Sequence, residues 1–379
     1  GLGGAPLCAM ARGKGNREGA QGIMVNAGFM LLLSGAVLTV LGIAFHRPLL
    51  YLFGASEVTY PYASSYIVIY LIGTLCVMLS LGLNPYINCQ GFARTGMLTV
   101  ALGAAANIVL DPIFIFALHL GVRGAAIATV LSQFLSAAWV VKFLTSKKAE
   151  LKLDFRGFRP DCQCIQRITV LGIASFVMSF TDTLVQVACN ATLRNFGGDL
   201  YISVMTVLNS VRQIAQTPVL AIADGASTAI SYNYGAGLYK RTRDAIRFMT
   251  QIAIGYTMLV WMLVSLFPAL FIRIFNQDAE LVAAAVPALH IYFFGFVMMA
   301  FQYAGQSTFR ALGRAKYAVF FSLLRKAFIV VPLTLLLPYC WNLGVSGVFA
   351  AEPVSNCIGG LACYFTMRHV VMPELKMEN

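Results

Sequence analysis

The chain has 379 residues, of which 59% are hydrophobic and only 11% are charged, and its mean hydropathy is +0.76. This composition excludes a water-soluble globular protein, because too few polar side chains are available to cover a surface that faces water. The formal net charge of +12 would suit a nucleic-acid-binding protein, but the basic residues gather in alternate loops between apolar stretches. That pattern indicates a polytopic membrane protein without a nucleic-acid partner.

Apolar stretches that are long enough to cross a bilayer recur along the whole chain. A membrane-spanning helix needs roughly 20 apolar residues, and these stretches lack the two-residue alternation of a membrane barrel. We therefore predict an all-α fold in which a partial span ending near Met10 precedes about ten full spans. The full spans are expected near residues 20–45, 61–87, 97–118, 122–144, 168–193, 201–233, 248–272, 281–307, 317–339 and 345–367.

The loops between these spans predict the orientation of the chain. Alternate loops are rich in basic residues, whereas the intervening loops hold only Arg47, Arg123, Arg194 and Arg273. The rich set consists of Arg12, Lys14, Arg17, Arg94, Lys147, Lys148, Lys152, Arg156, Arg159, Arg167, Lys240, Arg241, Arg243, Arg247, Arg310, Arg314 and Lys316. Because cytoplasmic loops carry the excess of Lys and Arg, we predict a multi-pass protein of the plasma membrane (the cell inner membrane) whose C-terminus is cytoplasmic.

An internal repeat organises the chain. A shift of 222 positions pairs Gly3 with Gly225, Gly13 with Gly235, Gly15 with Gly237, Tyr70 with Tyr292, Gly73 with Gly295, Gly91 with Gly313 and Ala93 with Ala315. One further position aligns 121–124 with 344–347. The offset fits a unit of six spans, so we predict two six-helix lobes of the same orientation, related by an axis along the membrane normal.

The predicted lobes are residues 1–146 and 168–379, joined by a basic cytoplasmic linker at 147–167. The repeat places the partner of the span at 168–193 before Gly1, together with most of the partner of 201–233. We therefore expect an N-terminally incomplete sequence that lacks the first helix and part of the second. The N-terminal lobe would then hold the remainder of helix 2 to helix 6, and the C-terminal lobe helices 7 to 12 and the tail.

Several motifs resemble those of one transporter family. Residues 107–116 read Asn-Ile-Val-Leu-Asp-Pro-Ile-Phe-Ile-Phe, and 121–133 read Gly-Val-Arg-Gly-Ala-Ala-Ile-Ala-Thr-Val-Leu-Ser-Gln. The loops at 90–97 and 310–314, the stretch 181–184, the Gly-Gly-Asp-Leu at 197–200 and the Gly-Ala-Gly at 235–237 continue the likeness. In this order and over essentially the whole chain, they resemble the multidrug and toxic compound extrusion (MATE) family.

The resemblance implies a secondary antiporter that is not an enzyme and that needs no cofactor. It would export small organic compounds, typically cationic and amphipathic, in exchange for protons or sodium ions by alternating access of two lobes. The sequence agrees on the energy source, because it contains no G-x-x-x-x-G-K-[ST] phosphate loop. The expected partners are the substrate and membrane lipid, and we expect a monomer. Two alternatives stay open: a flippase for a lipid-linked saccharide in the same superfamily, and an inactive membrane remnant.

The first candidate site for the coupling ion lies near 107–111. Asn107 and Asp111 are four residues apart and share a helical face, and Pro112 removes a backbone donor beyond them. The oxygens of such a group suit a small cation such as sodium, and Thr129 offers a hydroxyl from the next predicted helix. In the resembled family the matching residues form a cation or proton site with an aspartate of the first helix, which this sequence lacks. The alternative is that Asn107 and Asp111 only tie neighbouring helices together.

Asp182 is the second candidate for coupling. It lies in the middle of a predicted span, where an ionisable side chain is costly and therefore a functional candidate. Many members of the resembled family have a glutamate at the matching position, so an aspartate has less reach. The alternative is a buried carboxyl group that is hydrogen-bonded to Thr181 or Thr183.

A substrate cavity in the C-terminal lobe is predicted from Arg212, Gln216, Met299, Gln302, Tyr303 and Gln306. Gln302 and Gln306 share a helical face, and methionine and aromatic side chains suit a pliable pocket. The alternatives are amides that bridge helices, apolar side chains that face lipid or pack between helices, and an arginine in an internal ion pair. Arg325, Lys326 and Glu352 lie near predicted helix boundaries, so no role is assigned to them. The sequence suggests no catalytic group and no metal site beyond sodium at Asn107 and Asp111.

Overall fold

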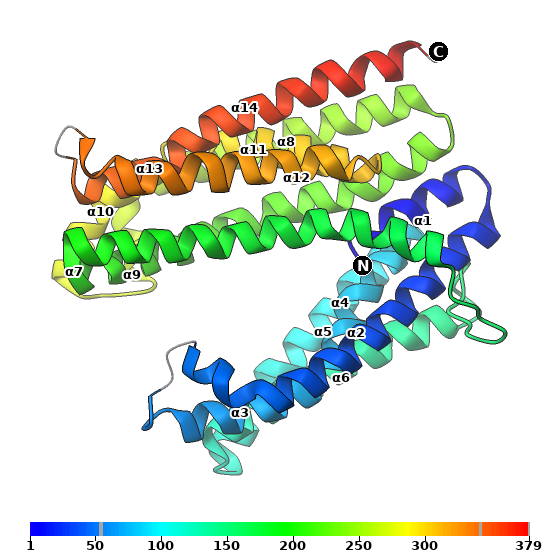
Figure 1. Ribbon diagram of the computed structural model, residues 1–379, viewed down its shortest axis with the longest axis horizontal. Coiled ribbons are helices and arrows are strands. Elements are labelled where there is room, and N and C mark those ends of the chain that lie inside the picture. The colour runs from blue at the N-terminus through cyan, green and yellow to red at the C-terminus, as the bar shows by residue number, and fades with distance from the viewer. Residues whose placement is uncertain (53–55, 341–342, 378–379) are drawn as a thin grey trace. The chain divides into compact units, whose positions relative to one another are not determined.

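The computed structural model describes residues 1–52, 56–340 and 343–377, which form helices and loops without a strand. The chain divides into two compact units, Gly1–Thr169 (unit 1) and Val170–Asn379 (unit 2). Each unit is a bundle of long helices (Figure 1). The basic stretch at 147–167, predicted as a linker, lies at the end of unit 1. Positions 378 and 379, which end the predicted C-terminal lobe, are outside the described residues.

The helices of unit 1 pack around α2 and α6. In chain order they are α1 (Gly4–Gly13), α2 (Arg17–Leu52), α3 (Tyr60–Ile72), α4 (Thr74–Cys89), α5 (Ala93–Pro112), the π-helical turn η1 (Ile113–Ala117) and α6 (Gly121–Thr145). Helix α2 contacts α1, α3 and α4, while α6 contacts α3, α4 and α5. The core between them is apolar and includes the fully buried Met24, Tyr86 and Leu144.

Unit 2 is built around α11 and α14. Its elements are the larger part of α7 (Cys162–Gly235), then α8 (Tyr239–Leu266), α9 (Pro268–Arg273), α10 (Ala279–Phe293), α11 (Met298–Ala311), α12 (Ala315–Leu323), the π-helical segment η2 (Leu324–Val330), α13 (Val331–Leu336) and α14 (Val345–Met377). Helix α11 contacts α8, α12 and α14, and α14 also contacts α10, α13 and η2.

Among the described residues, six helices are long and apolar enough to cross a membrane, or up to eight if each of two bent pairs is one span. The predicted ten full spans exceed this count for two reasons. Helix α7 counts once, although Gly198 interrupts it with φ 64° and ψ −162° between the predicted spans at 168–193 and 201–233. Helix α14 is not one of the six or eight, because polar side chains such as Glu352 and Asn356 interrupt its apolar stretch.

The predicted repeat recurs in the backbone of the two units. Three glycines of unit 1 with positive φ have counterparts in unit 2 with similar φ, at the offset of 222 or 223 positions. The pairs are Gly15 with Gly237 (74° and 72°), Gly91 with Gly313 (88° and 74°) and Gly121 with Gly344 (52° and 50°). The two bent helix pairs also correspond, since α3 and α4 meet at 52° and α10 and α11 at 51°. The units therefore share one local design.

Close backbone contacts repeat as well. A Cβ atom on Gly124 would lie 2.5 Å from the carbonyl oxygen of Phe114, and one on Gly347 would lie 2.7 Å from the carbonyl carbon of Leu337. The two contacts join equivalent residues, because Phe114 and Gly124 of unit 1 correspond to Leu337 and Gly347 of unit 2. Each glycine lies in the first turn of its helix, α6 or α14, and lets that helix approach the end of the preceding one, which no larger residue allows.

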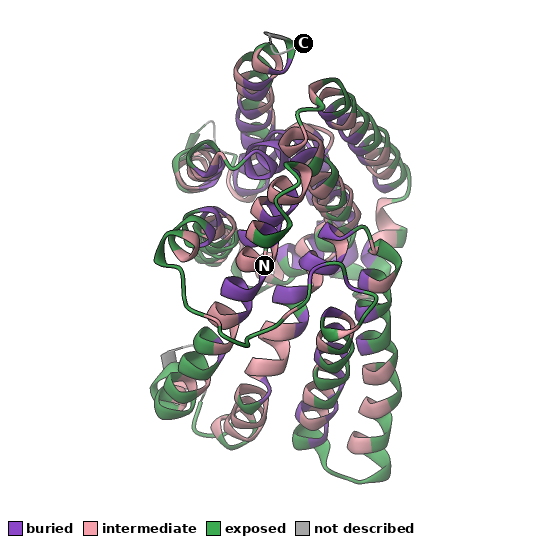
Figure 2. Ribbon diagram, turned by 90° about the vertical axis from the view of Figure 1, so that its right-hand side faces the viewer, coloured by how far each residue is buried: buried purple, intermediate pink, exposed green. Residues whose placement is uncertain are grey.

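Large apolar side chains remain exposed on the helices. Figure 2 shows exposed residues along much of the helical surface, with buried residues on the faces where helices meet. The exposed set includes Val40, Ile108, Phe116, Phe294 and Phe328. Such a surface suits lipid and not water, in agreement with the apolar composition.

Candidate functional site

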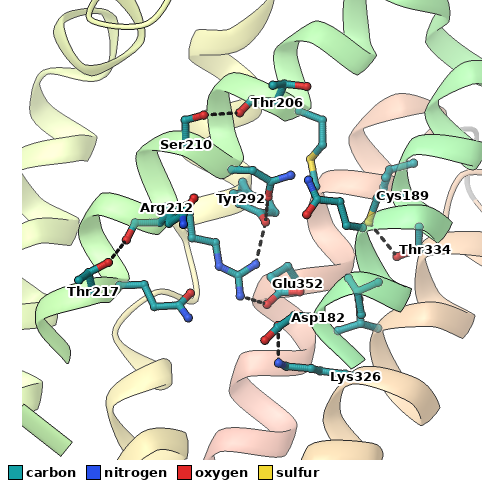
Figure 3. Close-up of a pocket in the computed structure, with 18 of the residues that line it drawn as sticks. Asp182, Cys189, Thr206, Ser210, Arg212, Thr217, Tyr292, Lys326, Thr334 and Glu352 are labelled. Carbon is teal, nitrogen blue, oxygen red and sulfur yellow. Dashed lines mark hydrogen bonds and ion pairs between the residues drawn. The ribbon is translucent and has the colours of Figure 1, made fainter. Parts of the chain in front are cut away.

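Unit 2 contains a polar cavity of about 440 Å³, here called the unit 2 cavity. Its walls come from α7, α10, η2, α13 and α14 (Figure 3). The charged residues in the lining are Asp182, Arg212, Lys326 and Glu352. Neutral polar side chains surround them, chiefly Gln186, Asn209, Gln213, Gln216 and Tyr292. A polar, charged space inside an apolar bundle is the kind of place where membrane transporters bind ligands and ions.

Glu352 is the most enclosed carboxylate of this cavity, and two arginines contact it. Arg325 donates to its Oε1 at 2.9 Å and to Oδ1 of Asn356 at 2.5 Å, and Arg212 forms a second ion pair with the same Oε1. The side chains of Glu352 and Arg325 are only 7% and 3% exposed. A carboxylate at this depth needs such partners, because an unpaired charge out of water is very costly.

Arg212 is held in place by Tyr292 of α10 as well as by Glu352. Its Nη1 donates to the Tyr292 hydroxyl at 2.7 Å, and that hydroxyl donates to Oδ1 of Asn209 at 3.0 Å. The guanidinium also lies 5.5 Å from the centre of the Tyr292 ring, within range of a cation–π contact. Arg212 therefore presents a fixed positive charge to the cavity. Asp224, which follows it along α7, pairs with Arg310 at 3.1 Å.

Asp182 contacts the ammonium group of Lys326. The two side chains form an ion pair across α7 and η2, and the Lys326 Nζ also donates to the carbonyl oxygen of Met178 at 3.0 Å. The Lys326 side chain is 7% exposed, whereas the Asp182 side chain is 54% exposed. The neighbouring Thr181 and Thr183 donate to backbone carbonyls within α7. The structure thus gives Asp182 a lysine partner that the sequence analysis did not consider.

The residues predicted to form a substrate cavity fall into two groups. Arg212 and Gln216 line the unit 2 cavity, and Gln216 donates to the Tyr303 hydroxyl at 2.5 Å. The remaining three, Met299, Gln302 and Gln306, are buried in α11 and are not part of its lining. Gln306 donates to the carbonyl of Ala318 at 3.4 Å, while the amide of Gln302 has no hydrogen-bond partner in the described part of the chain.

Unit 1 contains a smaller cavity of about 300 Å³, the unit 1 cavity, whose lining is uncharged. Asn107 and Thr129 contribute to it, and Asp111 lies next to it without lining it. The Asn107 amide donates to Oδ1 of Asp111 at 3.1 Å, and Thr129 donates to the carbonyl of Ala125 at 2.9 Å. Within the described residues, no three His, Cys, Asp or Glu side chains form a group that would hold a metal ion.

The two cavities differ because equivalent positions of the repeat hold different residues. At the offset of 222 or 223 positions, Arg325 and Lys326 correspond to the stretch 102–104, and Glu352 corresponds to Thr129. Gly103 and Ala104 line the unit 1 cavity. Long basic side chains in unit 2 therefore occupy the place that small residues hold in unit 1.

Sequence reasoning missed Arg325, Lys326 and Glu352, although the sequence contained a signal for them. All three interrupt predicted spans that are otherwise apolar, at 317–339 and 345–367. An ionisable side chain at membrane depth is a functional candidate with a partner to be named. The rule that singled out Asp182 applies equally to these residues.

The apolar helices define a multi-pass membrane protein, and unit 2 encloses a charged cavity within it. A family model described as MatE matches residues 1–113 and 174–336. The chain therefore belongs to the MatE family, whose members are transporters and not enzymes.

Individual relatives agree with this assignment. The chain is 24% identical to a FAD transporter of Shewanella oneidensis, over 95% of this chain and 80% of that protein. It is 22% identical to the multidrug export protein MepA of Staphylococcus haemolyticus, over 88% of this chain and 73% of that protein. Its fold matches a MOP superfamily transporter from Pyrococcus furiosus with a TM-score of 0.94 at 22% identity, over 99% of this chain and 84% of the other.

Proposed function

We propose that this chain is a secondary antiporter that exports small organic, cationic and amphipathic compounds in exchange for protons or sodium ions. It works by alternating access in the plasma membrane as a monomer, without a cofactor, and with its C-terminus in the cytoplasm. Its relationship to a multidrug export protein supports the export of foreign compounds. The basic residues in the loop before α7 and at or beside the N-terminal ends of α2, α5, α8 and α12 support the orientation.

The observation that carries this proposal is the position of Asp182. Its carboxylate is 54% exposed, lines the unit 2 cavity and has one partner among the described residues, the ammonium of Lys326. Glu352, by contrast, is enclosed by two arginines. Asp182 is therefore the carboxylate in this cavity that a cationic ligand can reach and that can exchange one cation for another.

A second coupling position is proposed in unit 1. Asp111 supplies a carboxylate and Asn107 an amide, and the two groups lie at hydrogen-bonding distance. Thr129 lines the same cavity as Asn107. The amide nitrogen of Asn107 faces the carboxylate, so its oxygen would serve as a sodium ligand only after the amide rotates. Asp111 itself supplies a carboxylate oxygen, the hard ligand that sodium prefers.

The proposed substrate contacts are the remaining predicted residues of unit 2. Arg212 and Gln216 line the cavity, and Tyr303 is joined to it through Gln216. Met299, Gln302 and Gln306 lie behind this wall in α11, where Gln302 holds an amide without a partner in the described part of the chain. A rotation of α11 or a side-chain rearrangement would be needed to bring them to a ligand.

A flippase for a lipid-linked saccharide is the second candidate function. It is favoured by the two arginines at Glu352 and by Lys326 beside them, because basic groups recognise the phosphates of such a lipid. A membrane remnant without transport activity is the third. Both predict that cells expressing the chain do not export an organic cation.

Ethidium efflux separates these functions. Cells that express the gene encoding this chain are loaded with ethidium, and efflux is compared with that of Asp111→Asn and Asp182→Asn at matched membrane abundance. The antiporter predicts efflux that collapses with a proton or sodium ionophore and that falls in Asp182→Asn. Full efflux in both variants would refute the coupling roles, and no efflux from the parent would favour the flippase or the remnant.

A further inference from the structure

Unit 2 holds more buried positive than negative charge in one connected group. This unit 2 charge cluster consists of Asp182, Arg212, Arg325, Lys326 and Glu352, which are joined through the ion pairs and the shared cavity described above. Three cations face two carboxylates. Both arginines pair with Glu352, so Lys326 is the cation of the cluster that neutralises the negative charge of Asp182.

Lys326 has no basic counterpart in unit 1, although the two units share the same repeated helix pattern. The corresponding stretch of unit 1, residues 102–104, has no basic residue, and two of its members line an uncharged cavity. Helix packing of this design therefore does not need an ammonium group at the position. Lys326 also lies within the π-helical segment η2, and such local irregularities in helices often mark functional sites.

The excess positive charge of the cluster limits how a cationic ligand can bind to Asp182. With Lys326 in place, a monocation entering the cavity would add a fourth positive charge to a cluster that already has one in excess. Exchange of partners alone does not change this total, since the displaced ammonium would remain charged at membrane depth, where an unpaired charge is costly. The ligand is accommodated without added charge only when one proton leaves the cluster.

We propose that Lys326 carries the proton in an exchange with an organic monocation at Asp182. The ligand takes the place of the ammonium on the carboxylate, and Lys326 releases one proton to water in the cavity and becomes a neutral amine. When a proton returns, the new ammonium displaces the ligand from Asp182. This mechanism rests on the proposed function and specifies its coupling ion as a proton and its ligand as an organic monocation.

The other groups around Lys326 are less suited to this role. The charged and titratable side chains that line the cavity with Lys326 or join its network of ion pairs and hydrogen bonds are Asp182, Cys189, Arg212, Arg325, Tyr292, Tyr303 and Glu352. Arginine stays protonated in proteins, and Glu352 is held by both arginines. Lysine differs from arginine because its amine can lose a proton when it is buried. The carbonyl of Met178, 3.0 Å from Nζ, keeps the amine near Asp182 after the exchange.

Substitution of Lys326 by arginine and by methionine gives opposite predictions. Lys326→Arg keeps a positive charge on Asp182 but cannot release its proton, so it should bind tetraphenylphosphonium at least 10-fold more weakly than the parent. Lys326→Met leaves Asp182 without a cation and should bind this permanent cation at least 10-fold more tightly. A merely structural ion pair predicts the reverse order, since arginine would preserve it and methionine would abolish it. Lys316→Met, which removes an exposed charge from α12, is the control and should match the parent.

The test uses the purified chain in detergent, with tetraphenylphosphonium as the probe and a pH indicator in weak buffer. The parent should release about one proton per bound cation, and Lys326→Arg none. Equal affinity and proton release in the parent and Lys326→Arg would overturn the role of Lys326 and leave the proposed function standing. A parent that binds no tetraphenylphosphonium but binds an anionic dye, with loss of the dye in Lys326→Met, would overturn both.

Discussion

Arg325 in η2 and Glu352 in α14 form a deeply buried ion pair, with 2.9 Å between Nη1 and Oε1 and side-chain exposures of 3% and 7%. Arg212 contacts the same carboxylate from α7. The contact of Arg212 joins α7 to α14 across 140 residues of chain and so helps to fix the wall of the unit 2 cavity.

Glu352→Gln should destabilise unit 2 strongly. It leaves the buried Arg325 and the partly buried Arg212 without their carboxylate. Removal of one partner from a buried pair costs about 3–5 kcal/mol. The measurement is thermal unfolding of the purified protein in detergent. Glu374→Gln is the matched control, because it breaks the pair between Arg314 and the 45% exposed Glu374, which is worth about 0–1 kcal/mol. Equal unfolding temperatures for the two variants would contradict the structural role of Glu352.

The repeated glycine contacts predict that Gly124→Ala and Gly347→Ala are both destabilising. In each case the new methyl group would meet backbone atoms within 2.7 Å, and overpacking of this kind costs about 1–3 kcal/mol. Gly255→Ala in α8 is the control, since a Cβ there meets nothing within 4 Å, and it should be neutral or slightly stabilising. Thermal unfolding again provides the measurement. Loss of stability in only one of the two repeat positions would argue against an equivalent packing role.

The membrane orientation can be tested with two exposed cysteines. Cys162 follows the basic stretch that is predicted to be cytoplasmic, and Cys340 lies in the connection before α14, which is predicted to be external. A membrane-impermeant maleimide should label Cys340 in intact cells and Cys162 only in inverted vesicles. The variants Cys162→Ser and Cys340→Ser assign the two signals. Labelling of Cys162 from outside would reverse the proposed topology.

The proposed coupling position in unit 1 predicts different effects for two conservative changes at Thr129. Thr129→Ser keeps the hydroxyl that lines the cavity with Asn107 and should retain efflux. Thr129→Val removes it at similar volume and, like Asp111→Asn, should reduce ion-coupled efflux at least 10-fold. Ethidium efflux at matched abundance is the readout. Unchanged efflux in Thr129→Val would remove Thr129 from the coupling site.

Sequence reasoning succeeded where the interactions are local or depend on composition. The apolar spans, the repeat and the contact between Asn107 and Asp111 follow from hydropathy, glycine register and a spacing of four residues on a helix. It could not pair Asp182 with Lys326 or Arg212 with Glu352, because those contacts join helices that are distant in sequence. The Arg212 and Glu352 positions are 140 residues apart, and only the packing of α7 against the later helices of unit 2 brings them together.

The most direct test of the central claim uses proteoliposomes that contain the purified protein and no ATP. An imposed proton or sodium gradient should drive tetraphenylphosphonium across the membrane against its own gradient in the parent, and Asp182→Asn should reduce this movement to the level of empty liposomes. The claim that Asp182 couples an ion gradient to export would be contradicted if Asp182→Asn transported as fast as the parent under the same gradient.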